Sequence, residues 1–112
     1  MSGEAAIDPQ RNLRRMHEYG PLYAQAKANR LHIEEYRKSL KAQLMKASGE
    51  SAIAAQERDA YAHPDYIAFL AGYKAAVEEE DTLRWRLLTA QAAIEVYRTL
   101  EASNRNMDRS AA

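Results

Sequence analysis

The sequence has no cysteine, and among its 112 residues there are only four glycines, three prolines and one phenylalanine. The absence of cysteine excludes disulfide bonds and thiolate chemistry, and nothing points to an oxidising compartment. No apolar run approaches the roughly 20 residues that a membrane-spanning helix needs. The segment from Met1 to Pro9 lacks the basic and apolar regions of a signal peptide. We therefore expect a cytoplasmic protein with no membrane partner.

Residue types that catalyse reactions or bind metals are present, but they do not form a known pattern. Di-iron helical bundles require Glu three residues before a ligating histidine, and His17, His32 and His63 all lack it. The acidic run from Glu78 to Asp81 would point in all directions around a helix, whereas a metal site needs converging ligands. No phosphate-binding glycine loop or zinc spacing is present. We predict no catalytic residue, no metal site and no cofactor, so the protein is expected not to be an enzyme.

Four segments have the apolar periodicity and the end signals of α-helices. The first is predicted to begin with Asp8 as N-cap and Pro9 in the first turn, and to end near Tyr19. Gly20 and Pro21 are expected to end or kink it, because proline disfavours helical geometry in the residue before it. The second segment is predicted to run from Pro21 to about Ala47, where Ser48 and Gly49 provide the stop.

A short third helix is predicted from Ser51, its cap, to Ala62, and the longest helix is predicted from Pro64 to about Ser103. Residues 1–7 and 104–112 are expected to be frayed tails of a single helical domain that spans residues 1–112. The sequence shows no strand pattern. The expected fold is all-α: a long antiparallel helical hairpin with short flanking helices and a coiled-coil-like seam. The second and fourth helices would be about 40 and 60 Å long, so their ends cannot match.

Apolar residues spaced alternately four and three apart define the expected seam of each long helix. In the second helix the seam contains Leu22, Ala26, Asn29, Ile33, Tyr36, Leu40 and Ala47. In the longest helix it contains Tyr66, Leu70, Tyr73, Val77, Glu80, Arg84, Leu87, Gln91, Ile94 and Arg98. The polar members are expected to fix register and partner choice, with a solvated ligand groove as the alternative.

The net charge of zero contains an asymmetry along the chain. From Gln10 to Lys46 there are nine Lys and Arg against three Glu, and from Ala47 to Ala102 there are five basic against ten acidic residues. The two halves are interpreted as complementary faces of one hairpin, with Glu80 expected to pair with Arg84 and Glu34 with Lys38. The alternative is a basic arm that binds nucleic acid through Arg11, Arg14, Arg15, Lys27, Arg30, Arg37, Lys38 and Lys41.

Exposed aromatic residues beside charges are the other candidate contacts. Trp85 lies off the predicted seam between Arg84 and Arg86, and tyrosine and tryptophan favour protein interfaces. Tyr61, His63 and Tyr66 surround Pro64 at the expected corner between two helices. These six residues are the candidates for binding a protein partner, although the corner residues could instead provide local packing.

Several segments resemble a group of small helical proteins of tailed bacteriophages and prophages. They are His17–Tyr23, Tyr36–Ser39, Glu57–Tyr66, Leu83–Trp85, Ile94–Arg98 and Glu101–Arg105. The resemblance covers about Leu13 to Arg109 and implies a phage accessory protein of the bacterial host cytoplasm, encoded near recombination and replication genes. It transfers no activity and no catalytic residue.

The leading functional hypothesis is a non-enzymatic phage accessory protein that binds another protein through a helical face. Its target would be a recombination or replication protein or a host defence complex, so that DNA recombination or host defence inhibition would be the setting. The first alternative is a single-stranded DNA-binding accessory protein that uses the basic N-terminal half. The second is a structural oligomer, since a thin hairpin of this size is expected to self-associate.

Overall fold

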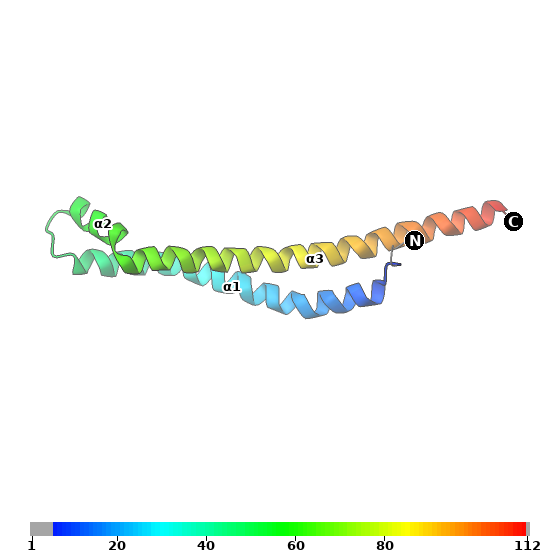
Figure 1. Cartoon of the computed structure of the whole chain (residues 1–112), viewed down its shortest axis with the longest axis horizontal. Coiled ribbons are helices and arrows are strands. Elements are labelled where there is room, and N and C mark those ends of the chain that lie inside the picture. Colours follow the sequence, from blue (N-terminus) through cyan, green and yellow to red (C-terminus); the bar gives the residue numbers. More distant parts are fainter. Residues whose placement is uncertain (1–5, 112) are drawn as a thin grey trace. The chain divides into compact units, whose positions relative to one another are not determined.

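The computed structural model describes residues 6–111, which form three α-helices and no strand. They are α1 (Pro9–Ala47), α2 (Ile53–Ala62) and α3 (Pro64–Ala111) (Figure 1). The two long helices form an antiparallel hairpin, and α2 lies in the connection between them. The predicted all-α hairpin is therefore confirmed.

The start of α1 follows the prediction. The backbone N–H of Arg11 donates a 3.1 Å hydrogen bond to Oδ1 of Asp8, which is the contact expected of an N-cap. Pro9 is the first helical residue. The buried Asn12 side chain donates to the Asp8 carbonyl oxygen at 2.9 Å, so a second interaction fixes the same end. Residues 1–5 of the predicted N-terminal tail lie outside the described residues.

The predicted end of a helix at Gly20 and Pro21 is wrong, because α1 continues through both residues for 39 residues in all. Proline removes one backbone N–H and crowds the carbonyl of His17, four residues earlier. Tyr19 and Tyr23 on either side are partly buried, and packing over a long seam outweighs one missing hydrogen bond. At 1.5 Å per residue, α1 is about 58 Å long and α3 about 72 Å, so their lengths are closer than predicted.

Two features were predicted for the connection from α1 to α2, of which one is confirmed and one is wrong. Gly49 adopts φ +77°, the left-handed conformation expected after the end of α1. The predicted cap Ser51 is wrong: α2 begins at Ile53, and its N-cap Ala52 makes no side-chain capping bond. The Gln56 side chain instead donates to the carbonyl oxygen of Glu50 at 2.8 Å, which fixes the connection before the helix.

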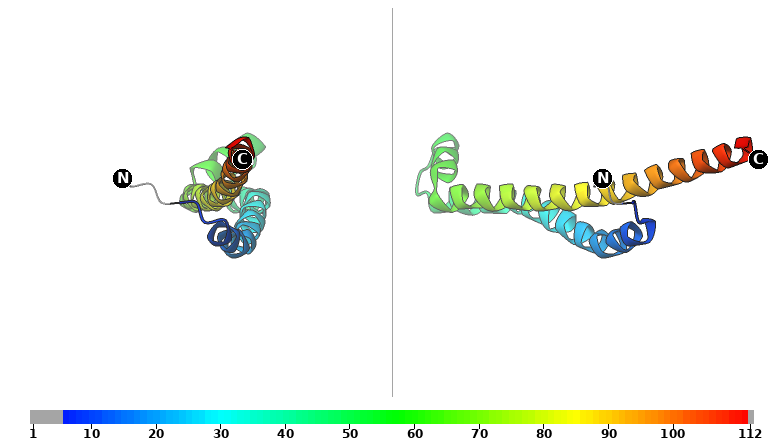
Figure 2. Two further views of the ribbon diagram at one scale, coloured as in Figure 1. Left: turned by 90° about the vertical axis from the view of Figure 1, so that its right-hand side faces the viewer. Right: turned by 45° about the vertical axis from the view of Figure 1, so that its right-hand side comes forward.

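The long helix α3 extends further than predicted. Its end was expected near Ser103, but it continues to Ala111, so the predicted frayed tail is helical over residues 104–111. No glycine or proline follows Gly72 in this segment, and the residues near the end favour a helix sufficiently to continue it. Every residue from 103 to 111 is exposed. This end of α3 projects past the start of α1 (Figures 1 and 2).

The chain divides into two compact units, each of which contains parts of both long helices. The turn unit comprises residues 24–81, and the terminal unit comprises residues 1–23 together with 82–112. In the turn unit Leu40, Leu44, Ala60 and Tyr66 form a buried cluster, with Met45 and Phe69 packed against it. In the terminal unit the most buried apolar residues are Leu83 and Ala90, at 7% and 2% exposure.

The burial pattern confirms a seven-residue seam but corrects half of its positions. In α3 the buried and partly buried positions include Tyr66, Phe69, Tyr73, Ala76, Val77, Glu80, Leu83, Leu87, Ala90, Ile94 and Tyr97. Six of these were predicted, whereas the predicted Leu70, Arg84, Gln91 and Arg98 are exposed and the residue before each is buried or partly buried. In α1 the predicted Ala26, Ile33 and Leu40 are buried or partly buried. The predicted Leu22, Asn29, Tyr36 and Ala47 are exposed, and Tyr23, Arg30 and Leu44 are buried or partly buried instead. Of the polar residues expected in the seams, only Glu80 is buried.

Candidate interaction surfaces

The buried carboxylate of Glu80 is held by Arg30, which reaches it from α1 within the turn unit. Nε of Arg30 donates to one Glu80 oxygen at 2.6 Å, and its second terminal nitrogen donates to the other at 3.1 Å. Glu34 accepts a further bond from Arg30 at 2.9 Å, so the predicted Glu34–Lys38 pair is replaced. These carboxylates, Glu80 above all, raise the pKa of the Arg30 guanidinium. The bidentate geometry fixes the register of the two helices.

A second basic residue of α1, Lys41, is engaged by α2. Its ammonium lies 5.0 Å from the centroid of the Tyr61 ring and donates to Glu57 at 3.3 Å. The interaction with Tyr61 is the largest cause of a raised Lys41 pKa, followed by the bond to Glu57, and partial burial opposes both. Lys38 pairs with the exposed Glu35 at 3.4 Å. Three of the eight nucleic-acid candidates are therefore already bound to carboxylates.

Folding also cancels most of the charge asymmetry along the chain. The turn unit has eight basic and ten acidic residues, and the terminal unit has eight basic and six acidic residues. The charges of +6 and −5 on the two sequence halves become about −2 and +2 on the two units. Complementary pairing of the halves agrees with this result. The remaining nucleic-acid candidates Arg11, Arg14, Arg15, Lys27 and Arg37 are exposed.

The three corner candidates participate in packing and capping. Tyr66 is only 8% exposed and makes an edge-to-face contact with Tyr61, with ring centroids 5.2 Å apart. Phe69 continues the aromatic row at 6.0 Å from Tyr66. His63 begins α3, since its Nδ1 accepts a 3.0 Å bond from the N–H of Asp65. The corner therefore holds the turn unit together, and Tyr66 is the one of the three whose side chain is buried.

In the terminal unit, both arginines beside Trp85 lie near aromatic rings. The guanidinium of Arg86 lies 5.3 Å from the centroid of the Tyr19 ring, so it bridges α3 and α1. Arg84 lies 5.7 Å from the centroid of the Trp85 ring. Trp85 itself is 61% exposed, which places it off the seam as predicted. Arginine stacking leaves the rest of the indole accessible to another molecule.

Trp85 is the first residue of an exposed apolar face that the sequence interpretation missed. Its members are Trp85, Leu88, Ala92, Val96, Leu100 and Met107, and all six are exposed. At about 100° per residue they occupy an arc of about 120° on the side of α3 opposite the seam. We call this surface the outer stripe. No charged residue falls within its arc from Thr82 to Met107. The signal in the sequence is a second apolar repeat with a spacing of three and four.

The turn unit contains an apolar groove between its two long helices. The groove has a volume of about 320 Å³ and is lined by His32, Ile33, Tyr36, Phe69 and Gly72. A methyl group at Gly72 would contact no neighbour within 4 Å, so the groove is open at that point. Tyr36 and Phe69 border it with ring centroids 6.3 Å apart. The groove is small and carries few polar groups that could orient a ligand.

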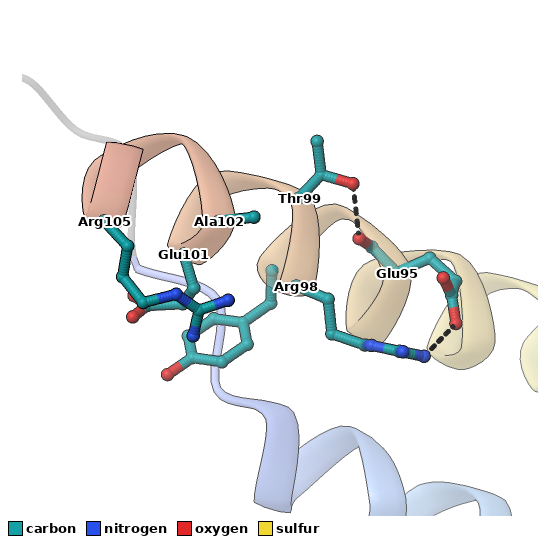
Figure 3. A pocket seen from close by; sticks show the side chains of 7 residues that line it. Glu95, Arg98, Thr99, Glu101, Ala102 and Arg105 are labelled. Atoms are coloured by element: carbon teal, nitrogen blue, oxygen red, sulfur yellow. Dashed lines mark hydrogen bonds and ion pairs between the residues drawn. The ribbon is translucent and has the colours of Figure 1, made fainter. Parts of the chain in front are cut away.

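A polar hollow of about 570 Å³ lies against the end of α3 in the terminal unit (Figure 3). Its lining residues are Glu95, Tyr97, Arg98, Thr99, Glu101, Ala102 and Arg105. Arg98 donates to the Glu95 carboxylate at 3.1 Å, and the Thr99 hydroxyl donates to the Glu95 carbonyl at 3.1 Å. All of the described lining residues come from one helix, so they do not converge from several segments as the groups of a catalytic site do.

Within residues 6–111, no group of three or more His, Asp or Glu side chains could hold a metal ion. Over the same residues, none of the helices combines the length and the apolarity that crossing a membrane requires. The prediction that the protein is not an enzyme stays a prediction. Comparisons with protein-family models, with curated proteins and with solved structures found no match. The phage resemblance therefore rests on the sequence segments alone.

Proposed function

We propose that the protein is a non-enzymatic binding module that packs the outer stripe of α3 against a helix of another protein molecule. The observation that carries the proposal is the exposure of Trp85, Leu88, Val96, Leu100 and Met107 along one uncharged helix face, at 41% to 69% each. An isolated hairpin needs an apolar seam on one side of α3 only. Apolar residues on two opposite sides are typical of a helix that packs between two neighbours.

The total exposed surface supports the same proposal. The chain exposes 8431 Å². A compact monomer of 12.7 kDa is expected to expose about 6,200 Å². The excess of about 2,200 Å² exceeds the roughly 800 Å² that each partner contributes to a specific interface. In addition, no large side chain among the described residues is fully buried. The hairpin therefore leaves much apolar surface for a partner to cover.

The targets that the phage resemblance implies, a recombination or replication protein or a host defence complex, belong to this proposal as its expected partners. Affinity capture with the whole chain as bait tests it. We expect a defined set of proteins to be retained by the wild type and lost with Val96→Glu, which places a charge in the middle of the outer stripe. Ile67→Glu is the matched control, because Ile67 is 58% exposed on α3 in the turn unit. Equal capture by both variants would contradict the proposal.

The exposed Arg11, Arg14 and Arg15 in the terminal unit favour single-stranded DNA binding as a second candidate function. Cations would follow the phosphates and Trp85 would stack on a base. Fluorescence anisotropy of labelled oligonucleotides over a salt series tests this candidate. Micromolar binding that weakens steeply with salt would support it, and no binding at low salt would remove it.

A further inference from the structure

The outer stripe has a spacing that is symmetric about its centre. Relative to Val96, Ala92 and Leu100 lie four residues before and after, and Trp85 and Met107 lie eleven residues before and after. Two such helices in antiparallel orientation, with Val96 at the same level in both, would therefore bring every stripe residue except Leu88 to the level of another stripe residue. A face that matches itself in this way is the requirement for a two-fold symmetric interface.

The residues that would meet at each level are also complementary in size. The small Ala92 would lie at the level of the large Leu100 of the other copy, so that a large side chain fills the space beside a small one. Trp85 would lie at the level of Met107, and thioether sulfur packs favourably against aromatic rings. Val96 would meet its own copy on the symmetry axis. Leu88 would lie near the uncharged Asn104.

The projecting end of α3 gives a reason for this orientation. Residues 103–111 are exposed on every side, because α3 extends past the start of α1 (Figures 1 and 2). In the antiparallel arrangement, residues 98–110 of each copy would lie along residues 82–94 of the other, where α1 already supports α3. Each copy would thus cover the unsupported helix end of the other. The chain has a net charge of zero, so two copies do not repel each other through net charge.

From these observations we infer that the occupant of the outer stripe is a second copy of the chain, packed antiparallel about Val96. The inference rests on the proposed function, since it names the partner of the same surface. The excess exposed surface of about 2,200 Å² per chain is more than the roughly 800 Å² per partner that a stable dimer of standard size buries. The stripe is about 33 Å long between Trp85 and Met107, which corresponds to about six helical turns.

Sedimentation equilibrium of the whole chain tests the inference. The wild type is expected to be a dimer at about 10 μM or higher concentration. Val96→Glu and Val96→Lys would each place two like charges on the axis and weaken association about a hundredfold or more. A one-to-one mixture of the two variants would restore the dimer, because opposite charges then meet. Both variants should keep wild-type helix content by circular dichroism, since Val96 is 49% exposed. The control Ile67→Glu should stay dimeric.

Cysteine crosslinking determines the orientation cleanly, because the chain has no cysteine of its own. Val96→Cys should form a disulfide-linked dimer on oxidation. A mixture of Trp85→Cys and Met107→Cys should also crosslink, whereas Trp85→Cys alone should not, since its two copies would be about 33 Å apart. Self-crosslinking of Trp85→Cys would overturn the antiparallel arrangement.

The outcomes separate this inference from the proposed function. A wild-type chain that stays monomeric at about 100 μM overturns the second copy as occupant. If Val96→Glu then still abolishes capture of another protein, the proposed function stands with a different partner. A dimer that Val96→Glu leaves unchanged overturns the inference, because association would use a different face.

Discussion

The two units use the same helix α3 and the same seven-residue seam, but the opposite side of that helix differs between them. In the turn unit the side away from the seam carries the apolar Ile67 and Ala71, followed by the charged Lys74, Glu78 and Asp81. In the terminal unit the same side is the uncharged outer stripe. A hairpin needs only the seam, so its folding does not account for the stripe. The difference is what the proposed binding function expects, in which the turn unit is stabilised from within and the terminal unit in part by a partner.

The largest expected effect that tests this comparison comes from leucine truncation in each unit. Leu40→Ala, in the buried cluster of the turn unit, should lower the unfolding free energy by about 2–4 kcal/mol. Leu88→Ala, in the outer stripe, should have much less effect on the monomer, because Leu88 is 41% exposed. Urea denaturation followed by circular dichroism, on samples dilute enough to be monomeric, measures both. Equal losses would show that the outer stripe belongs to the core of the hairpin.

Substitutions in the Arg30–Glu80 pair measure how much this ion pair contributes to the stability of the turn unit. Arg30→Ala leaves a buried carboxylate without its bidentate partner and should lower the urea midpoint strongly. The double substitution to methionine at both positions should be less destabilising than Arg30→Ala, because no buried charge is then left unpaired. The opposite order would mean that the attraction between the two groups exceeds the cost of removing them from water.

Replacing a glycine by alanine should raise the stability of the protein at one position and lower it at another position, in the other unit. Gly20→Ala in the terminal unit should stabilise α1 by about 0.5–1 kcal/mol, through helix propensity. A methyl group there meets nothing within 4 Å. Gly49→Ala in the turn unit should destabilise by about 1 kcal/mol, because the left-handed conformation is unfavourable for alanine. Gly49 has φ +77°. Thermal unfolding of the two variants checks the signs, and stabilisation by Gly49→Ala would show that the turn relaxes.

The smallest effect is a pH dependence at Lys41. Its pKa is raised in the folded chain by Tyr61 and Glu57, so its contribution to stability is fully present below the unfolded pKa of about 10.4. As pH rises through the higher folded value, the proton is lost and the contribution disappears. The wild type should therefore lose more stability than Lys41→Met above about pH 10.4. If the unfolding free energies of the two proteins fell equally with rising pH in alkaline urea titrations, a role for this interaction would be refuted.

Much of the fold could be predicted from local signals, whereas the seam could be predicted only in part. The Asp8 cap and the Gly49 stop depend on a few adjacent atoms, so the sequence indicates them directly. To predict the seam, one residue had to be chosen from each pair of neighbours that lie three and four residues after the previous seam position. At Phe69 and Leu70 both choices are apolar, but at Leu83 and Arg84 the apolar choice is the one that is buried. A consistent preference for the less polar neighbour would have given the correct residue at Leu83, Ala90 and Tyr97.

The interaction surface was predicted at one residue only. Trp85 was identified because it is aromatic and lies off the seam, but Leu88, Ala92, Val96, Leu100 and Met107 were not grouped with it. Met107 was missed because the end of α3 was expected to be frayed from residue 104. The other four lie within the predicted helix, and they were missed because only one apolar seam was sought on it. Tyr66 was predicted both as a seam residue and as a candidate contact at the corner, and its exposure of 8% agrees with the seam position and with local packing.

The antiparallel course of the two long helices has a consequence for the order of folding. In the turn unit Lys41 and Glu57 lie 16 positions apart and Arg30 and Glu80 lie 50 apart. In the terminal unit Tyr19 and Arg86 lie 67 positions apart. Closing a short loop costs less entropy than closing a long one. The hairpin is therefore expected to form first near α2 and then to extend along the two long helices towards the chain ends. The terminal unit would form last and open first, so the proposed binding face would be the last part of the hairpin to become ordered.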